Sequence, residues 1–405
     1  MTSQTDNNVS MRLCHDIDIA HCSNASDVME EKEPSLASPE DSGLISPEVG
    51  RIVEITLAVF INGSLSCVGL VTNMINMVVF AKHGFRDSVT ISLMALAVAD
   101  LLGLACMLNM CVCFGLMQFA TFTVIDPLAL VYVAGSWPHA MFTRMSTWIT
   151  VYICVERFLC VYVPLKVRSF ITAKKTSAYI LLISGLMVAC YANIYATFGV
   201  EWRFDPRVNA TRLMLWVSSN RREMENISGV MNGSILPAVS LTIIIICTCA
   251  MVSSLNSSSS WREQHAGLSQ TKHSQTGSSQ DAAASQRSVA DSGKNMPERR
   301  VARMVIVIAL ICVMCTVPEL TINIVRRFFP DLDANRRYRY TNVIMYYAKY
   351  TIQNVNASVN IAIYYRMSSR YRQTLRSMLC LDSNSVSEKK GVVKAIKQEK
   401  IVRQS

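Results

Sequence analysis

The chain has 405 residues, of which 51% are hydrophobic and 17% charged, and it carries a net charge of +10. A soluble protein of this size has closer to ~25% charged residues, so the composition excludes an ordinary soluble domain and indicates a membrane protein. The basic residues lie in short stretches beside apolar runs, which is typical of membrane topology, and they form no groove-sized patch for a nucleic acid.

Residues 1–50 are polar and acidic and lack the apolar run of a cleavable signal peptide. We predict that this segment is disordered and extracellular, because it buries too little apolar surface to fold alone. It contains glycosylation sequences at Asn8 and Asn24. Cys14 and Cys22 are close enough in sequence for a small loop disulfide, and whether they form one is left open. We expect no metal site in this segment, since it has no apolar framework to hold ligands.

Seven apolar stretches follow, and each is long enough to cross a ~30 Å hydrocarbon core, which requires ~20 helical residues. All should be helices, because a backbone in lipid must satisfy its own hydrogen bonds. We therefore predict an all-α membrane protein with a seven-transmembrane helix bundle between residues 51 and 366. The stretches cover residues 52–80, 88–116, 133–163, 174–198, 229–253, 300–327 and 341–365.

Loop charge predicts the orientation of the bundle. Lys and Arg concentrate after the first, third and seventh stretches and before the sixth, whereas the loop 117–135 has neither. This pattern places the N-terminus outside the plasma membrane and the C-terminus inside. Arginines at 221–222 and 326–339 oppose the assignment, but glycosylation sequences at Asn209 and Asn226 fall on the outer side and support it.

The inner side contains three further segments. Residues 254–298 are rich in Ser and Gln, which predicts a flexible loop between the fifth and sixth helices. Residues 367–380 place apolar side chains on one helical face and arginines on the other, which predicts a short amphipathic helix against the membrane lipids. Cys380 is a candidate palmitoylation site, and we predict that residues 381–405 are a disordered cytoplasmic tail.

Charged and polar residues recur inside the stretches. A buried aspartate such as Asp100 in a membrane helix suggests a functional site, although Asn73, Asp100 and Asn360 could equally hydrogen-bond across helices. Arg144, in the middle of an apolar helix, needs an acceptor. That acceptor is either Glu319 or an anionic group of a ligand, and we favour Glu319.

The third stretch contains the dipeptide Glu156-Arg157 within WITVYICVERFLCVYVPLK. The cost of an arginine at the centre of a spanning helix places this pair near an end, where snorkelling to the headgroups is the simpler alternative to a functional role. Glu156-Arg157-Phe158 followed by Pro164-Leu165 resembles the rhodopsin-like (class A) G-protein-coupled receptors, as do GLVTN, LAVAD and NASVNIAIY. Residues 136–167 resemble the chemosensory-type receptors of gastropod molluscs, and the whole resemblance covers residues 52–380.

The resemblance implies a receptor, not an enzyme, that transmits binding of an extracellular small molecule or peptide to a heterotrimeric G protein. A neuropeptide receptor of the same fold is the alternative, since NASVNIAIY also resembles peptide receptors. The implied G-protein switch consists of Glu156, Arg157, Glu298 and Tyr364, with Arg157 and Glu298 paired in the resting state. An allosteric sodium ion, the single cofactor implied, would be held by Asp100, Ser146, Asn356 and Asn360. Helical phase and the resemblance give a ligand pocket of His139, Thr143, Arg144, Glu319, Asn323, Tyr346, Tyr350 and Asn354.

The chain departs from the family pattern in three places. Ile361 replaces the usual proline of the seventh helix, so we expect a less kinked helix there. Thr316 replaces the usual tryptophan of the sixth helix, near Pro318. The usual outer disulfide is absent, because Tyr132 stands at the helix-three position and residues 199–228 contain no cysteine.

Other classes of membrane protein fit less well. A retinal-binding opsin needs a lysine deep in the seventh helix, whereas Lys349 lies near its outer end. A transporter would show inverted repeats, and we find no internal repeat. A membrane enzyme would need a nucleophile with its base or a set of metal ligands, and no such residues converge in the sequence.

Overall fold

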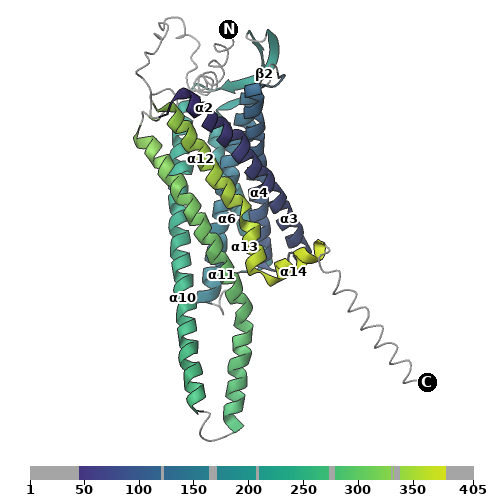
Figure 1. Ribbon diagram of the computed structural model, residues 1–405, viewed down its shortest axis with the longest axis vertical. Helices are drawn as coiled ribbons and strands as arrows, with labels where there is room; N and C mark the ends of the chain where they lie inside the picture. Colours follow the sequence, from purple (N-terminus) through teal and green to yellow (C-terminus); the bar gives the residue numbers. More distant parts are fainter. Residues whose placement is uncertain are drawn as a thin grey trace, which may run out of the picture.

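A computed structural model describes residues 45–119, 123–163, 171–206, 209–272, 279–329, 332 and 338–379, without side chains at 47, 258–298 and 339. It forms a bundle of long helices with a strand hairpin at one end and a short crossing helix, α14 (Ser369–Met378), at the other (Figure 1). We call these the outer end and the inner end. The predictions for Asn8, Asn24, Cys14, Cys22, Cys380 and the tail 381–405 lie outside the described residues.

Helices occupy all seven predicted stretches, so the seven-helix fold is confirmed. Three spans begin with short helical segments that include a π-helical turn, labelled η, and the seventh is interrupted. The spans are α2 (Pro47–Ile55) with η1 (Thr56–Ile61) and α3 (Asn62–His83); α4 (Ser88–Phe119); α5 (Pro127–Leu130) with η2 (Val131–Ser136) and α6 (Trp137–Tyr162); α8 (Ala173–Tyr195); α9 (Arg221–Val230) with η3 (Met231–Ile235) and α10 (Leu236–Lys272); α11 (Ser279–Phe328); and α12 (Arg339–Ser358) with α13 (Asn360–Met367).

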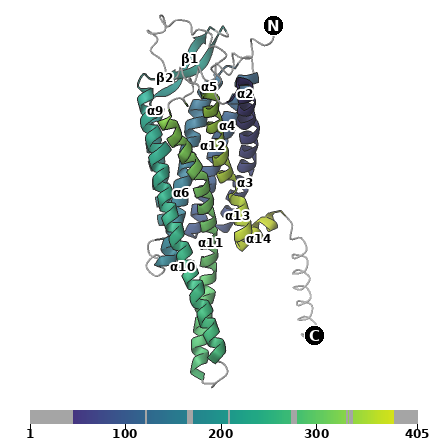
Figure 2. The same cartoon turned by 60° about the vertical axis from the view of Figure 1, so that its left-hand side comes forward.

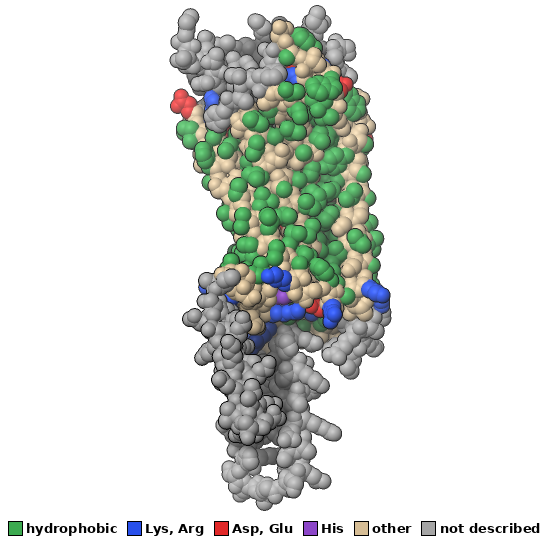
Figure 3. All heavy atoms as spheres, turned by 90° about the vertical axis from the view of Figure 1, so that its right-hand side faces the viewer, with side chains coloured by type: hydrophobic (Ala, Val, Ile, Leu, Met, Phe, Trp, Pro, Cys, Tyr) green, Lys and Arg blue, Asp and Glu red, His purple; other side chains and the backbone are tan. Residues whose placement is uncertain are grey.

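The surface of the bundle suits a lipid environment. Among the described residues, five helical segments are long and apolar enough to cross a membrane, namely Glu48–His83, Ser88–Gln118, Ala173–Tyr195, Arg221–Ser257 and Arg299–Phe328. The third and seventh spans contain more polar and charged residues, many of which face the bundle interior. Large apolar side chains point outward, with Leu181 71% and Met314 73% exposed. Figure 3 shows this apolar flank, with Lys and Arg side chains gathered along its inner rim.

Helix α6 is the centre of the bundle. It packs against α4, α8, α10 and α11, while α12 packs against α3 and α11. The main apolar core joins these helices through side chains such as Leu96, Ile153, Met251 and Val305, all at most 2% exposed. Because α6 contacts most of the bundle, its polar side chains can meet partners from several helices.

Two antiparallel strands, β1 (Phe198–Asp205) and β2 (Ala210–Val217), follow the fourth span, which ends at Tyr195 rather than at the predicted residue 198. The predicted glycosylation residue Asn209 is exposed at the turn between the strands, where its φ of 52° is in the region that asparagine tolerates. Arg212 of β2 pairs with Asp205 at 3.2 Å and with Asp126 at 3.5 Å. The Asp205 pair joins the two strands, and the Asp126 pair holds the hairpin against the segment before helix three.

The inner segment 254–298 is helical where it is described, which corrects the predicted loop. Helix α10 continues to Lys272 and α11 begins at Ser279, and both extend side by side beyond the bundle (Figures 1 and 2). The segment is rich in Ser and Gln and offers no apolar face, which is why we expected a loop. A helix that is already nucleated, however, extends by further residues at little cost in free energy. Residues 282–284 are alanines, the best helix formers.

Helix seven is interrupted at Val359 even though it lacks the proline. In a regular helix the Ala357 carbonyl would accept a hydrogen bond from the Ile361 N–H. Here the Ala357 carbonyl accepts one from the Asn73 amide of helix one at 2.9 Å. One residue later the backbone makes a tighter turn, in which the Ala362 N–H donates to the Val359 carbonyl at 3.0 Å. Our expectation of a more regular helix therefore missed a polar contact from helix one.

Candidate functional site

The predicted sodium-site residues lie together at mid-height of the bundle. Asp100 of α4 is 3% exposed. Its Oδ1 accepts a hydrogen bond from Ser146 of α6 at 2.5 Å, and its Oδ2 accepts one from the Asn360 amide at 2.9 Å. Asn356 lies on the wall of the same small cavity as Asp100 and Ser146. The carboxylate therefore joins helices two, three and seven.

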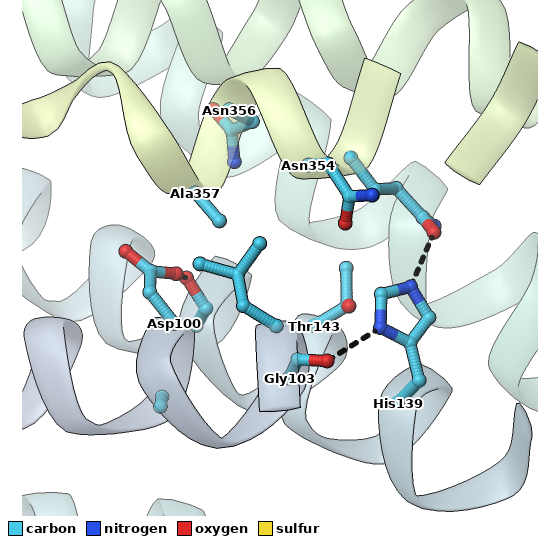
Figure 4. A pocket seen from close by; sticks show the side chains of 11 residues that line it. Asp100, Gly103, His139, Thr143, Asn354, Asn356 and Ala357 are labelled. Carbon is cyan, nitrogen blue, oxygen red and sulfur yellow. Dashed lines mark hydrogen bonds between the residues drawn. The ribbon is translucent and has the colours of Figure 1, made fainter. Parts of the chain in front are cut away.

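This cavity has room for about one water-sized occupant and extends toward the outer end. His139 closes it, with Nδ1 2.9 Å from the Gly103 carbonyl oxygen and Nε2 3.1 Å from Gln353 Oε1 (Figure 4). Asn354 donates its amide to Asn62 at 2.9 Å, but its Oδ1 is buried without a partner and points into the cavity (Figure 4). Three predicted pocket residues thus line this cavity, namely His139, Thr143 and Asn354.

Arg144 and Glu319 form the predicted ion pair between α6 and α11. The Arg144 Nη2 atom lies 2.7 Å from Glu319 Oε1, and the side chains are 4% and 7% exposed. The Nε and Nη1 atoms of Arg144 are also buried but have no hydrogen-bond partner. The pair is therefore incomplete on the arginine side.

The remaining predicted pocket residues lie nearer the outer end. The rings of Tyr346 and Tyr350 of α12 lie tilted against each other with centres 5.9 Å apart, and Tyr350 meets the His139 ring edge-on at 5.3 Å. Asn323 is engaged differently, because its amide donates to the Gly233 carbonyl at 2.9 Å and holds α11 against η3.

The inner end of α6 contains the Glu156–Arg157 pair. Arg157 Nη2 lies 2.5 Å from Glu156 Oε1, and the side chains are 10% and 1% exposed. Two serines of α4 also donate to Glu156, namely Ser88 to Oε1 and Ser92 to Oε2. Glu298 belongs to α11, but its side chain is outside the described residues, so its predicted contact with Arg157 is not tested.

Tyr364 of α13 is buried near this end, and its hydroxyl has no hydrogen-bond partner. Its ring contacts Phe80 at 5.2 Å and Tyr371 of α14 at 5.6 Å between centres. The Tyr371 hydroxyl donates to Asn76 at 2.6 Å, and the Asn76 amide donates to Asn73 at 3.3 Å. Since Asn73 also binds the Ala357 carbonyl, a continuous polar chain links α14 to the interruption of helix seven.

Sequence reasoning missed this chain, although the spacing of Asn73 and Asn76 places both on one helical face. It also missed Arg221 of α9, which is 1% exposed and pairs with Glu225. The Arg221 guanidinium lies 4.6 Å from the Tyr132 ring centre and 5.2 Å from that of Phe198. The available signal was the position of Arg221 on the predicted outer side, where the loop-charge rule expects few arginines.

Asn226, the second predicted outer glycosylation residue, is exposed on α9. The described cysteines are all free, so no disulfide joins the described outer segments.

Comparison with known families agrees with the geometry. Residues 60–382 match the family model described as Serpentine type 7TM GPCR chemoreceptor Srw. The match extends from the first span through α14, and so includes the buried polar residues described above. No curated protein sequence matches the chain. The chain is a multi-pass membrane protein and belongs to the Srw family of serpentine seven-transmembrane G-protein-coupled chemoreceptors.

Proposed function

We propose that the chain binds an extracellular ligand between the outer halves of its helices and activates a heterotrimeric G protein at its inner end. In this proposal the N-terminus is outside the plasma membrane, the C-terminus is in the cytoplasm, and the chain catalyses no reaction. Its resemblance to the rhodopsin-like receptors supports the proposal, and the loop charges support the orientation.

One observation carries this proposal, namely the buried Glu156–Arg157 pair at the inner end. Two charges in a largely water-free place are costly, so their presence at this depth indicates a functional role. Ser88 and Ser92 satisfy Glu156 and thereby fasten the inner ends of α4 and α6 together. Release of Arg157 from this group would free a guanidinium for a cytoplasmic partner.

The switch then has two states with a named contact in one of them. In the resting state Arg157 is paired and Tyr364 is packed beneath Phe80 with its hydroxyl free. In the active state both side chains would turn toward the inner opening. A ligand shifts this equilibrium only to the extent that it binds the active state more tightly.

We also propose that Asp100 and Ser146, with Asn356 and Asn360 beside them, hold a sodium ion that favours the resting state. The lining suits the ion, because it offers a carboxylate, hydroxyl groups and amide oxygens, the ligands that hard cations prefer. The unpartnered Oδ1 of Asn354 borders the same cavity. An ion or its water would satisfy this oxygen.

The test is ligand-dependent nucleotide exchange on a Gα subunit by the full chain in membranes. A promiscuous Gα reporter would be screened with small soluble molecules and peptides, with the Arg157→Ala variant as the matched control. We expect activation of the wild-type chain and none of the variant at equal surface expression. Ligand-dependent substrate flux without nucleotide exchange would instead support a transporter.

A further inference from the structure

Three cationic side chains gather in the outer half of the bundle. Arg144 comes from α6, Arg326 from the outer end of α11, and Lys349 from α12. Lys349 interacts electrostatically with both arginines and with Glu319. We call Arg144, Arg326 and Lys349 the outer cation cluster. Among the described residues, Arg144 is the member of the cluster that has an ion pair, namely with Glu319, so the cations outnumber the carboxylates paired with them.

Arg144 is the deepest member. Glu319 satisfies one of its terminal nitrogens, and the Tyr191 hydroxyl interacts with the guanidinium, while the Nε and Nη1 atoms are buried and make no hydrogen bond. A guanidinium presents its donors as a planar fork that matches the two oxygens of a carboxylate. The free side of Arg144 therefore has the geometry to accept a second carboxylate beside that of Glu319.

Lys349 is the accessible member. Its Nζ atom lies 4.5 Å from the Tyr346 ring centre and 5.1 Å from that of Tyr350. It forms no ion pair with any carboxylate of the described residues, and ring faces are a weaker partner than a carboxylate. The side chains of Lys349, Tyr346 and Tyr350 are partly exposed.

Arg326 completes the rim of the cluster. Its Nε donates to Asn342 at 2.6 Å, and its guanidinium lies 4.1 Å from the Tyr346 ring centre. Tyr346 is thus held between Arg326 and Lys349. Such rings can contact the apolar part of a small molecule whose charged end is directed at the cations.

We infer that the outer cation cluster binds the carboxylate group of an organic acid, which names the ligand class for the receptor function proposed above and rests on it. The acid would supply the negative charge that the cluster lacks, with its apolar part against Tyr346 and Tyr350. A second carboxylate on the Nε and Nη1 side of Arg144 would repel Glu319 across the guanidinium. Binding would then loosen the contact between α6 and α11, the helices that carry Arg157 and Glu298 at their inner ends.

Direct binding tests this inference without any G protein. The purified full chain in lipid nanodiscs would be heated with a panel of straight-chain and aromatic monocarboxylates, each compared with its own primary amide. We expect at least one acid to raise the melting temperature in a saturable manner and its amide to do so at least about tenfold more weakly. Lys349→Gln should weaken binding of that acid about tenfold, and Lys349→Arg should restore it.

Arg222→Gln is the matched control, because Arg222 is an exposed cation at the same end of the bundle and lies outside the cluster. It removes the same charge and should leave acid binding unchanged. Peptides with a free C-terminal carboxylate, compared with their amidated forms, distinguish a peptide source of the carboxylate from a small acid.

Three results would overturn the inference. They are stabilisation by amides as strong as by acids, an equal response of Lys349→Gln and wild type, and no stabilisation by any acid or free-acid peptide in the panel. The inference and the proposed function fail separately. Acid binding without nucleotide exchange would count against the signalling function, whereas nucleotide exchange triggered by a neutral ligand at an intact cluster would count against the acid.

Discussion

The guanidinium of Arg221 lies 4.6 Å from the centre of the Tyr132 ring and joins the start of helix five to the outer end of helix three. Tyr132 stands where the resembling receptors have a cysteine, and Phe198 at the start of β1 contributes a second ring face to the same cation. Tyr191, Ile194 and Phe198 form a small apolar cluster with Tyr132 around this contact. The described outer segments are thus held together by packing and a cation–π contact.

Arg221→Met should destabilise the receptor more than Tyr132→Leu. Loss of the arginine removes its ion pair with Glu225 together with its cation–π contacts to both Tyr132 and Phe198. Loss of the ring removes a cation–π contact of about 0.5–2 kcal/mol together with some packing. Tyr132→Phe keeps the ring and is the control. The measurement is the melting temperature of the purified chain in detergent.

Mild reducing agent should leave ligand binding unchanged, because the described cysteines are free. The measurement is ligand affinity with and without reductant. A loss of affinity would instead indicate a disulfide between Cys14 and Cys22 and would make the N-terminal segment part of the binding site.

Arg157→Ala should abolish G-protein activation and leave surface expression near that of the wild type. The arginine lies at the inner end of α6, away from the outer cation cluster, so ligand affinity should change little. Agonist-stimulated nucleotide exchange, normalised to surface expression, is the measurement. A variant that signals as well as the wild type would remove the role assigned to Arg157.

Two carboxylates compete for the role of holding Arg157 at rest. Glu156→Gln weakens the contact that the structure describes, and Glu298→Ala removes the contact predicted from the sequence. The predicted Arg157–Glu298 pair lies at the membrane–water boundary, where a partly solvated pair contributes about 1 kcal/mol, or a roughly fivefold change in the resting equilibrium. The buried Glu156–Arg157 pair should contribute at least as much. The variant that raises basal signalling by about this factor identifies the restraint. Neither substitution should have any effect in an Arg157→Ala background.

Sodium should stabilise the wild-type chain, and Asp100→Asn should abolish the response. An ion that binds the folded state alone raises its stability in proportion to RT ln(1 + [Na⁺]/Kd). The measurement compares melting temperatures in sodium chloride and in choline chloride at equal ionic strength, which keeps screening constant. An equal sodium response of the two proteins would place the ion elsewhere.

Much of the site could be predicted because the membrane limits the alternatives. A charge such as Arg144 in an apolar helix must find an acceptor, and Glu319 was the nearest candidate at matching depth. The resemblance to the rhodopsin-like receptors brought Asp100, Ser146 and Asn360 together. The length of the apolar stretches was sufficient to locate all seven spans, because each can cross the hydrocarbon core as a helix.

Other contacts could not be predicted, since they depend on how far each helix is rotated about its axis. The sequence alone does not show that Ser88 and Ser92 face Glu156, or that Tyr371 reaches Asn76. The β1–β2 hairpin was missed because its strands follow an apolar helix without an obvious boundary. The helical continuation of α10 and α11 was missed because a composition rich in Ser and Gln indicates a solvent-exposed segment. It does not show whether that segment continues a neighbouring helix.

The interruption at Val359 has a consequence for how helix seven can move. A proline at position 361 would lack the backbone N–H donor, whereas Ile361 retains it. The Ala357 carbonyl accepts a hydrogen bond from Asn73 of another helix. A movement of α3 that withdrew Asn73 would leave this carbonyl to the Ile361 N–H as its donor, and the two halves of the helix could then join into one. The joint is therefore reversible, and Ile361→Pro would make it permanent.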